Sequence, residues 1–291
     1  MKVDKFRTVI IYIIIILLGL VCLLPLLNIV AISFSSSAAV EGNMVGLIPV
    51  GFSTAAYKKI LEDSQFWHSF LISVERVVLT LIINFVLIVL MAYPLSKTNA
   101  QFRGRNIYAN LMIFAMLFNG GMIPTFLLVK SYGLLNTVWA LVLPGAVPIF
   151  NVILVMNFFA AVPKELEEAA FIDGANPFQV LTKIFIPISK PVLATVSLFS
   201  IVGSWNDFYS GLIYMSKAAY YPLMTYIQSL QINVEDLIKQ GNLSAVVDSA
   251  SLGNTNLNAA KIVVAVIPLL LIYPLLQRYF VSGIVVGSVK G

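Results

Sequence analysis

The sequence has very few of the residues that carry redox or metal chemistry. Cys22 is its only cysteine and His68 its only histidine. A disulfide needs two cysteines, and a zinc site normally needs several cysteine or histidine ligands. The sequence therefore excludes an internal disulfide and a zinc site built from several such ligands, and it argues against a redox function.

Charged residues are also scarce. They make up 11% of the chain against roughly 25% in an ordinary soluble domain, while 59% of the residues are hydrophobic and the mean hydropathy is +0.94. The formal charge of +5 does not indicate nucleic acid, because the basic residues stand singly at the ends of apolar runs and form no patch. This composition predicts an integral membrane protein.

Long apolar runs predict an all-α fold that crosses the membrane several times. The run from Val9 to Ile32 has no charge and exceeds the ~20 residues needed to cross the hydrocarbon core. It is also longer than the apolar part of a cleaved signal peptide, so we expect it to be retained. The predicted spans lie at about 9–32, 70–93, 107–129, 138–160, 192–214 and 262–280, within a single transmembrane domain over residues 1–291.

The distribution of Lys and Arg predicts how the chain is oriented. Eleven of these residues lie at the two ends of the chain, between the second and third spans, and between the fourth and fifth spans; the other seven are spread over longer loops on the opposite side. Since Lys and Arg accumulate in cytoplasmic loops, both termini are predicted to be cytoplasmic. The first group is Lys2, Lys5, Arg7, Lys97, Arg103, Arg105, Lys164, Lys183, Lys190, Arg278 and Lys290.

Glycine and proline residues interrupt three of the predicted spans. Broken helices at membrane depth normally line protein or a water-filled cavity, so this pattern favours a transport pathway. The alternative is that the prolines only kink packed helices. The residues concerned are Gly120, Gly121 and Pro124 in the third span, Pro144 and Pro148 in the fourth, and Pro268 and Pro274 in the last.

The connection between the fourth and fifth spans predicts a helical hairpin. Pro163 suits a first helical turn, and Gly174 can take the left-handed conformation that ends the helix. A second helix is predicted to begin with Asn176 as its cap and Pro177 as its first residue, and to end at Pro187. Its apolar side is typical of a docking site; an amphipathic hairpin that lies on the membrane is the alternative.

This segment resembles the EAA signature of ABC importer permeases, which is Glu-Ala-Ala, Gly and Ile-x-Leu-Pro at fixed spacing. Glu168, Ala169, Ala170, Gly174, Ile184 and Pro187 match it, and Ile186 replaces the usual Leu. Other stretches agree: AYPLSK at 92–97, GGMIPTFLLVKSYGLLNT at 120–137, SWNDF at 204–208, and the ending QRYFVSGIVVGSVKG. The chain is similar to the carbohydrate-uptake permeases of the maltose type, and most of all to those that serve complex oligosaccharides.

The resemblance implies a type I ABC importer subunit in a bacterial cytoplasmic membrane. Such a subunit pairs with a second, homologous permease and with two ABC ATPases that use ATP and magnesium. An extracellular solute-binding protein delivers the sugar. It also implies that the hairpin 163–187 couples to the ATPase through Glu168, Ala169, Ala170, Asp173, Gly174, Ile184 and Pro187. The chain has no G-x-x-x-x-G-K-[ST] loop, so we expect a non-catalytic subunit without a cofactor of its own, in contact with membrane lipids and not with nucleic acid.

Two other classes of function remain as alternatives. A secondary transporter or channel would need ionisable groups inside its spans, and Asp207 is the plausible one, with Glu75 and Arg76 nearer the outer end of the second span. An intramembrane hydrolase would need a nucleophile and a base, but His68 beside Ser69 has no visible group to orient it.

The fifth span also contains a candidate set of sugar contacts. Trp205, Asn206, Asp207 and Tyr209 combine aromatic faces with hydrogen-bonding groups, and Asn119 in the third span is assigned to the same pathway. The alternative is that these residues hold the helix to the partner permease. By resemblance, the outer loop around 236–258 is placed over the binding protein, although it could equally be a solvated connector.

Overall fold

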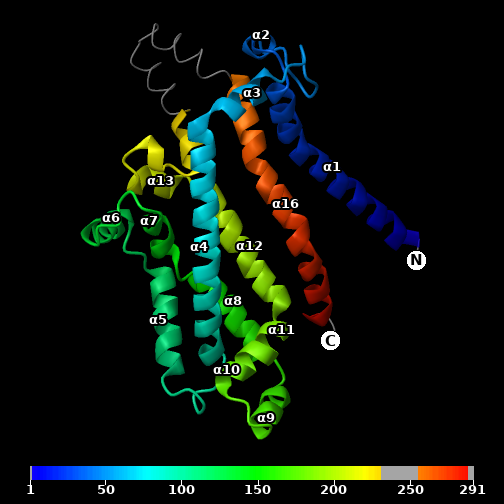
Figure 1. Ribbon diagram of the computed structural model, residues 1–291. Coiled ribbons are helices and arrows are strands. Elements are labelled where there is room, and N and C mark those ends of the chain that lie inside the picture. The colour runs from blue at the N-terminus through cyan, green and yellow to red at the C-terminus, as the bar shows by residue number, and fades with distance from the viewer. Residues whose placement is uncertain (1, 231–254, 288–291) are drawn as a thin grey trace. The chain divides into compact units, whose positions relative to one another are not determined.

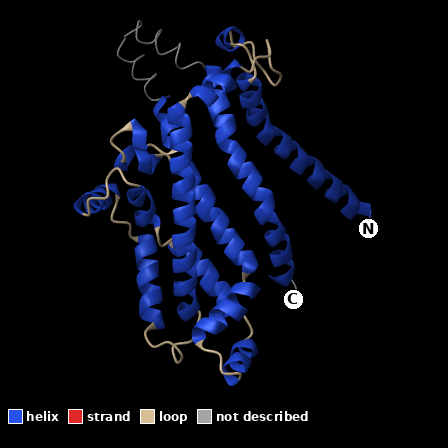
Figure 2. Cartoon of the chain, in the orientation of Figure 1, coloured by secondary structure: helices blue, strands red, loops and turns tan. Residues whose placement is uncertain are grey.

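The computed structural model describes residues 2–230 and 255–287, and every regular element in those ranges is a helix (Figure 2). The all-α prediction is confirmed. Residue contacts divide the chain into two compact units, a division that the sequence does not predict. One unit is Met1–Trp67 with Tyr226–Pro268, and the other is His68–Thr225 with Leu269–Gly291.

The first unit contains α1 (Lys2–Ser33), α2 (Ser37–Glu41), α3 (Ala55–Glu62) and the N-terminal part of α16 (Thr255–Gly287) (Figure 1). Apolar side chains are exposed all along α1, from Val9 to Val30. A surface of this kind requires lipid or another protein to cover it, as a membrane span does.

Asp63, at the end of α3, holds three parts of the first unit together. One carboxylate oxygen accepts hydrogen bonds from Lys261 Nζ of α16 at 2.7 Å and from the Tyr226 hydroxyl at 2.9 Å, and the other accepts one from the Phe66 N–H at 3.0 Å. Asp63 thus joins Tyr226, which precedes residues 231–254, to Lys261, which follows them.

The second unit is built around α4 (Ser64–Leu95), α8 (Ile149–Ala160) and α12 (Lys190–Asn206) (Figure 1). Their apolar side chains form one buried cluster with those of the hairpin segment: Ile88, Val89 and Ala92 from α4, Val152, Val155 and Phe159 from α8, Val192, Leu193 and Val196 from α12, and Val180, Leu181 and Phe185. The remaining elements of this unit are α5 (Arg105–Leu117), α6 (Met122–Ser131), α7 (Val138–Val142), η1 (Leu143–Gly145), α9 (Lys164–Ile172), α10 (Pro177–Val180), η2 (Leu181–Phe185), α11 (Ile186–Ile188), α13 (Tyr209–Tyr214) and η3 (Ala218–Tyr220).

Within the described residues, three helices are individually long and apolar enough to cross a membrane: Arg7–Ser33, Ser64–Leu95 and Thr255–Pro274. Three bent helix pairs also qualify if each pair is one span: α5 with α6 at 111°, Val138–Gly145 with α8 at 47°, and Pro177–Ile188 with α12 at 83°. By length and composition alone, this gives up to six spans.

The breaks in these spans agree only in part with the prediction from glycine and proline. Gly121, with φ +89°, lies at the sharp bend between α5 and α6, whereas Pro124 is in the first turn of α6, where its missing N–H costs nothing. Pro148 stands directly before α8. Pro268 and Pro274 do not interrupt α16, so that expectation is wrong, because one proline removes a single helical hydrogen bond and a long helix can continue past it.

The predicted fifth span at 192–214 is not one helix. Helix α12 ends at Asn206 and α13 begins at Tyr209, which leaves a break at Asp207 and Phe208. Residues 219–230, which precede the predicted outer loop, are largely helical, in η3 and at residues 223–230. The predicted loop 236–258 lies mostly outside the described residues, but its last residues, from Thr255, already belong to α16.

Candidate functional site

The hairpin between α8 and α12 forms as its sequence predicts up to its second helix. Helix α9 begins directly after Pro163 and ends at Ile172, and Gly174 has φ +80° in the left-handed region. Asn176 then caps α10 in a capping box: its side chain accepts a hydrogen bond from the Gln179 N–H, and its own N–H donates to the Gln179 side chain, both at 2.9 Å.

The second arm ends within one residue of the predicted stop at Pro187. It runs from α10 through a π-helical segment, η2, which the sequence did not predict, into α11, which ends at Ile188. A π-helical turn shifts the hydrogen-bond register by one residue, so the chain can accommodate a proline that follows it. The 83° bend then falls at Ser189, between Pro187 and the start of α12.

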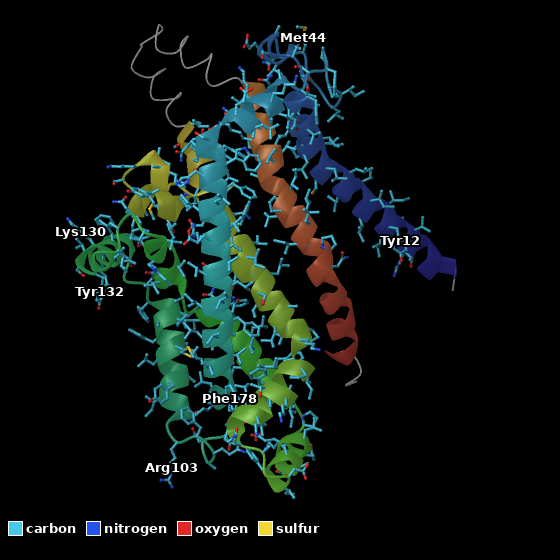
Figure 3. All side chains as sticks on the ribbon, in the orientation of Figure 1. Tyr12, Met44, Arg103, Lys130, Tyr132 and Phe178 are labelled. Carbon is cyan, nitrogen blue, oxygen red and sulfur yellow. The ribbon has the colours of Figure 1, made fainter. Side chains whose placement is uncertain are left out.

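The tip of the hairpin presents both charge and apolar surface. Glu168, Ala169, Asp173 and Gly174 are exposed, whereas Ala170 and Ile184 are half-buried against the cluster of α4, α8 and α12. Large apolar side chains are exposed beside them: Ile172 is 87% exposed and Phe178, labelled in Figure 3, is 65% exposed. The combination is that of a docking surface.

A buried ion pair that the sequence reasoning missed holds the base of the hairpin. Glu167, one residue before the exposed Glu168, accepts hydrogen bonds from Lys97 Nζ at 2.8 Å and from the Tyr93 hydroxyl at 3.3 Å. The Lys97 ammonium also lies over the rings of Tyr93 and Phe185. Lys97 ends the AYPLSK stretch that the sequence analysis noted, and that basic residue is the signal that could have found the pair.

Asp207 has its ionic partner in its own chain. Arg76 of α4 forms an ion pair with the Asp207 carboxylate and donates to the Asp207 carbonyl at 2.9 Å. The other carboxylate oxygen accepts from the Ser210 N–H at 3.0 Å. Through these contacts the acid holds the break between α12 and α13 to α4.

The other predicted pathway residues separate into a buried one and three exposed ones. Trp205 is only 5% exposed and packs edge-on against Phe70, so its ring offers no open face to a sugar in this structure. Asn206, Tyr209 and Asn119 are exposed. The Tyr209 hydroxyl contacts Met122 Sδ at 3.2 Å, and because Asn119 and Met122 flank the bend between α5 and α6, that bend lies beside the break after α12.

The N-terminal half of α4 contributes His68 and Glu75 to a pocket of about 300 Å³, which is also lined by Asn136, Thr137 and Tyr220. Ser69 is fully buried while His68 is exposed, so these neighbours do not point into one site as a nucleophile and its base would. In the part of the chain that the structure describes, no group of three or more His, Cys, Asp or Glu residues could hold a metal ion.

Bent apolar helices joined to an exposed hairpin with the EAA signature are features of a membrane permease. Residues 78–286 match the family described as the inner membrane component of binding-protein-dependent transport systems, and the chain belongs to that family. It is therefore a multi-pass inner membrane protein and the permease component of such a transport system.

Individual relatives match over nearly the whole chain. Protein LplC of Bacillus subtilis is 41% identical over 94% of this chain and 91% of its own length. The polygalacturonan/rhamnogalacturonan transport system permease protein YtcP of the same organism is 39% identical over 99% of both chains. A chain from the crystal structure of a bacterial ABC transporter involved in the import of the acidic polysaccharide alginate is 32% identical, covers 96% of this chain and 98% of its own, and has a TM-score of 0.82.

Proposed function

We propose that this chain is one of two membrane-spanning subunits of an ATP-driven importer that takes up an oligosaccharide delivered by an extracellular binding protein. Membership of the permease family supports the transport role. The substrate class is supported by YtcP and by the alginate importer, whose names refer to carbohydrate polymers.

The exposed tip of the hairpin is the observation that carries the coupling role. Glu168 and Asp173 are exposed on the same hairpin as the exposed Ile172 and Phe178, so the hairpin presents both acidic and apolar side chains to its surroundings. Interfaces commonly combine an apolar centre with a polar rim. An ABC ATPase is the partner that the EAA signature implies, and we assign this tip as its docking surface.

The orientation follows from the charges. The hairpin lies on the side with eleven of the eighteen Lys and Arg residues, so the positive-inside rule places it and both termini in the cytoplasm. Single cysteines at the exposed positions Asn43 and Lys183, in a chain with Cys22→Ser, test this assignment. An impermeant maleimide added to intact cells should label position 43 and not position 183. Labelling of position 183 would show that the hairpin faces outward and that the proposed orientation is wrong.

The two adjoining helix breaks are the best-supported place for the sugar pathway. They bring exposed hydrogen-bonding groups of Asn119, Asn206 and Tyr209 into one region of the second unit, and saccharides are bound through such groups. Asp207 and Trp205 hold the break after α12 in place, because Asp207 pairs with Arg76 and Trp205 packs against Phe70.

Purification of the tagged chain from its own host tests the proposed function. We expect a second permease and an ABC ATPase to co-purify, and vesicles that contain the complex to accumulate an oligosaccharide only with ATP inside and the binding protein outside. Glu168→Lys should release the ATPase, because it reverses a charge at the docking surface, whereas Lys130→Met, at an exposed position of α6, should not. Uptake by the chain alone, driven by an ion gradient, would instead support a secondary transporter.

A further inference from the structure

Lys97 lies where three segments meet. It follows α4 by two residues, and its Nζ atom is 2.8 Å from Glu167 Oε2 of α9, in the first arm of the hairpin. The same ammonium is 4.2 Å from the ring centroid of Phe185 in the second arm and 4.1 Å from that of Tyr93 in α4. One cation thus connects both arms of the hairpin to the end of α4.

Both charges of this contact are removed from solvent. The side chains of Lys97 and Glu167 are 12% and 11% exposed. Burial lowers the pKa of Lys97, and the Glu167 carboxylate opposes that shift. Since a buried charge that loses its partner is strongly unfavourable, the two arms cannot move away from α4 without breaking the contact at a cost.

Helix α4 connects the region of Lys97 to the helix break at Asp207. It is helical without interruption from Ser64 to Leu95, and Arg76, which holds Asp207, belongs to the same helix. The 21 positions between Arg76 and Lys97 correspond to roughly 30 Å at 1.5 Å per residue. Two ion pairs, one formed by α4 and one formed two residues beyond its end, therefore join the hairpin to the region of the proposed sugar pathway.

We propose that the Lys97–Glu167 pair is the positioning contact by which the hairpin moves α4, and with α4 the helix break at Asp207. The inference rests on the proposed function, since it requires an ATPase to act on the exposed tip. The covalent path from the hairpin into α12 passes through the 83° bend at Ser189. A bend of this kind can absorb a displacement by rotation of a few backbone dihedrals, whereas a packed ion pair transmits it.

The test follows nucleotide-driven movement at the break and needs no knowledge of the sugar. The complete complex carries Cys22→Ser and Asn206→Cys, and the maleimide reactivity of position 206 is measured with and without ATP plus vanadate. In the otherwise unchanged complex, the reactivity should change by about tenfold on trapping. Lys97→Met should remove most of that change while the ATPase stays bound and hydrolyses ATP. Arg103→Met is the matched control, because Arg103 is exposed on the loop that follows α4 (Figure 3).

Charge exchange separates transmission from a purely structural role. Lys97→Glu combined with Glu167→Lys restores the pair and should recover most of the reactivity change that either single variant loses. Glu167→Gln keeps the shape of the side chain and one acceptor oxygen, which can still accept from Lys97, but it removes the charge and places an NH2 donor at the second position. It should give normal membrane levels with a reduced change, even if Lys97→Met does not fold. An unaltered reactivity change in Lys97→Met or Glu167→Gln would overturn the inference, as would a failure of the exchange to restore it. If Glu168→Lys leaves the ATPase bound, the proposed docking surface fails instead, independently of Lys97.

Discussion

Arg76 and Asp207 lie 131 positions apart in the sequence and form an ion pair inside the second unit, with the guanidinium also bonded to the Asp207 carbonyl. Side-chain exposure is 4% for Arg76 and 29% for Asp207. An acid at membrane depth is costly unless it has a partner, and Arg76 supplies one at the point where α12 ends. The acid that suggested ion coupling in the sequence therefore has a structural partner.

Removal of either charge should destabilise the protein. Asp207→Asn leaves Arg76 buried without its counter-ion, and Arg76→Gln leaves Asp207 unpaired, so each is expected to cost about 3 to 5 kcal/mol. Thermal unfolding of the purified subunit in detergent measures the effect. Glu75→Gln, at the exposed neighbouring position, should leave the unfolding temperature within about one degree of the original, as surface substitutions usually do. Equal unfolding temperatures for all three variants would show that the pair adds nothing to stability.

Gly174 should tolerate asparagine far better than valine. Its φ of +80° is accessible to Gly and, at moderate cost, to Asn, but it is strained for a β-branched residue; a Cβ there would meet no neighbouring atom, so only the backbone conformation decides. We expect Gly174→Val to abolish ATP-driven uptake at a normal level in the membrane, and Gly174→Asn to retain most of it. Similar uptake rates for the two variants would mean that the left-handed turn is not required for coupling.

The hairpin shows how far local sequence signals reach. Gly174 and Asn176 act within a few residues of their own positions, so the turn and the capping box could be predicted. The end of the second arm lies within one residue of the predicted Pro187, but the π-helical segment that precedes it was not predicted. The EAA signature identified the segment, but Glu167 and Glu168 are the same residue type, and only packing decides which of them is buried.

The candidate pathway shows the same limit over longer distances. Asp207 was correctly chosen as an unusual intramembrane acid, but its partner, Arg76, is on another helix, and no local pattern in one sequence pairs two such residues. Trp205 was chosen for its aromatic ring, and whether that ring is free or buried depends on Phe70. Residue type thus located the region, whereas the contacts between helices assigned the roles within it.

Acid should weaken the first unit through Asp63. Burial acts to raise the pKa of this carboxyl, but hydrogen bonds from Lys261, Phe66 and Tyr226 outweigh it and lower the pKa below the ordinary value of 3.8. A folded-state pKa below the unfolded one means that the charged carboxylate stabilises the fold above pH 3.8, and that this contribution is lost as the pH falls through the lower folded-state value.

The unfolding temperature of Asp63→Asn should therefore lie below that of the unmodified protein at pH 7, and the gap should narrow as the pH falls below 3.8. Glu62→Gln, at the adjacent exposed position, is the control and should show no such convergence. A gap that is constant between pH 7 and pH 3 would mean that the charge of Asp63 does not stabilise the cluster with Lys261.

The last prediction concerns the exposed groups at the two helix breaks. Asn206→Ala removes a side chain that can both donate and accept hydrogen bonds, and Tyr209→Phe removes the hydroxyl near Met122 but keeps the ring. If these groups contact the sugar, each variant should reduce ATP-driven uptake by about tenfold, since a hydrogen bond lost at a binding site is worth about 1 to 1.5 kcal/mol. ATPase recovery and the unfolding temperature should not change, because neither residue is buried. Tyr132→Phe, which removes an exposed hydroxyl at the far end of α6 (Figure 3), is the matched control and should transport normally.

Trp205→Phe should lower the unfolding temperature more than it lowers uptake, because the indole packs inside the chain. Normal uptake in both Asn206→Ala and Tyr209→Phe would move the pathway away from these breaks, while a loss of uptake together with lower stability would assign the two residues to packing instead of sugar contact.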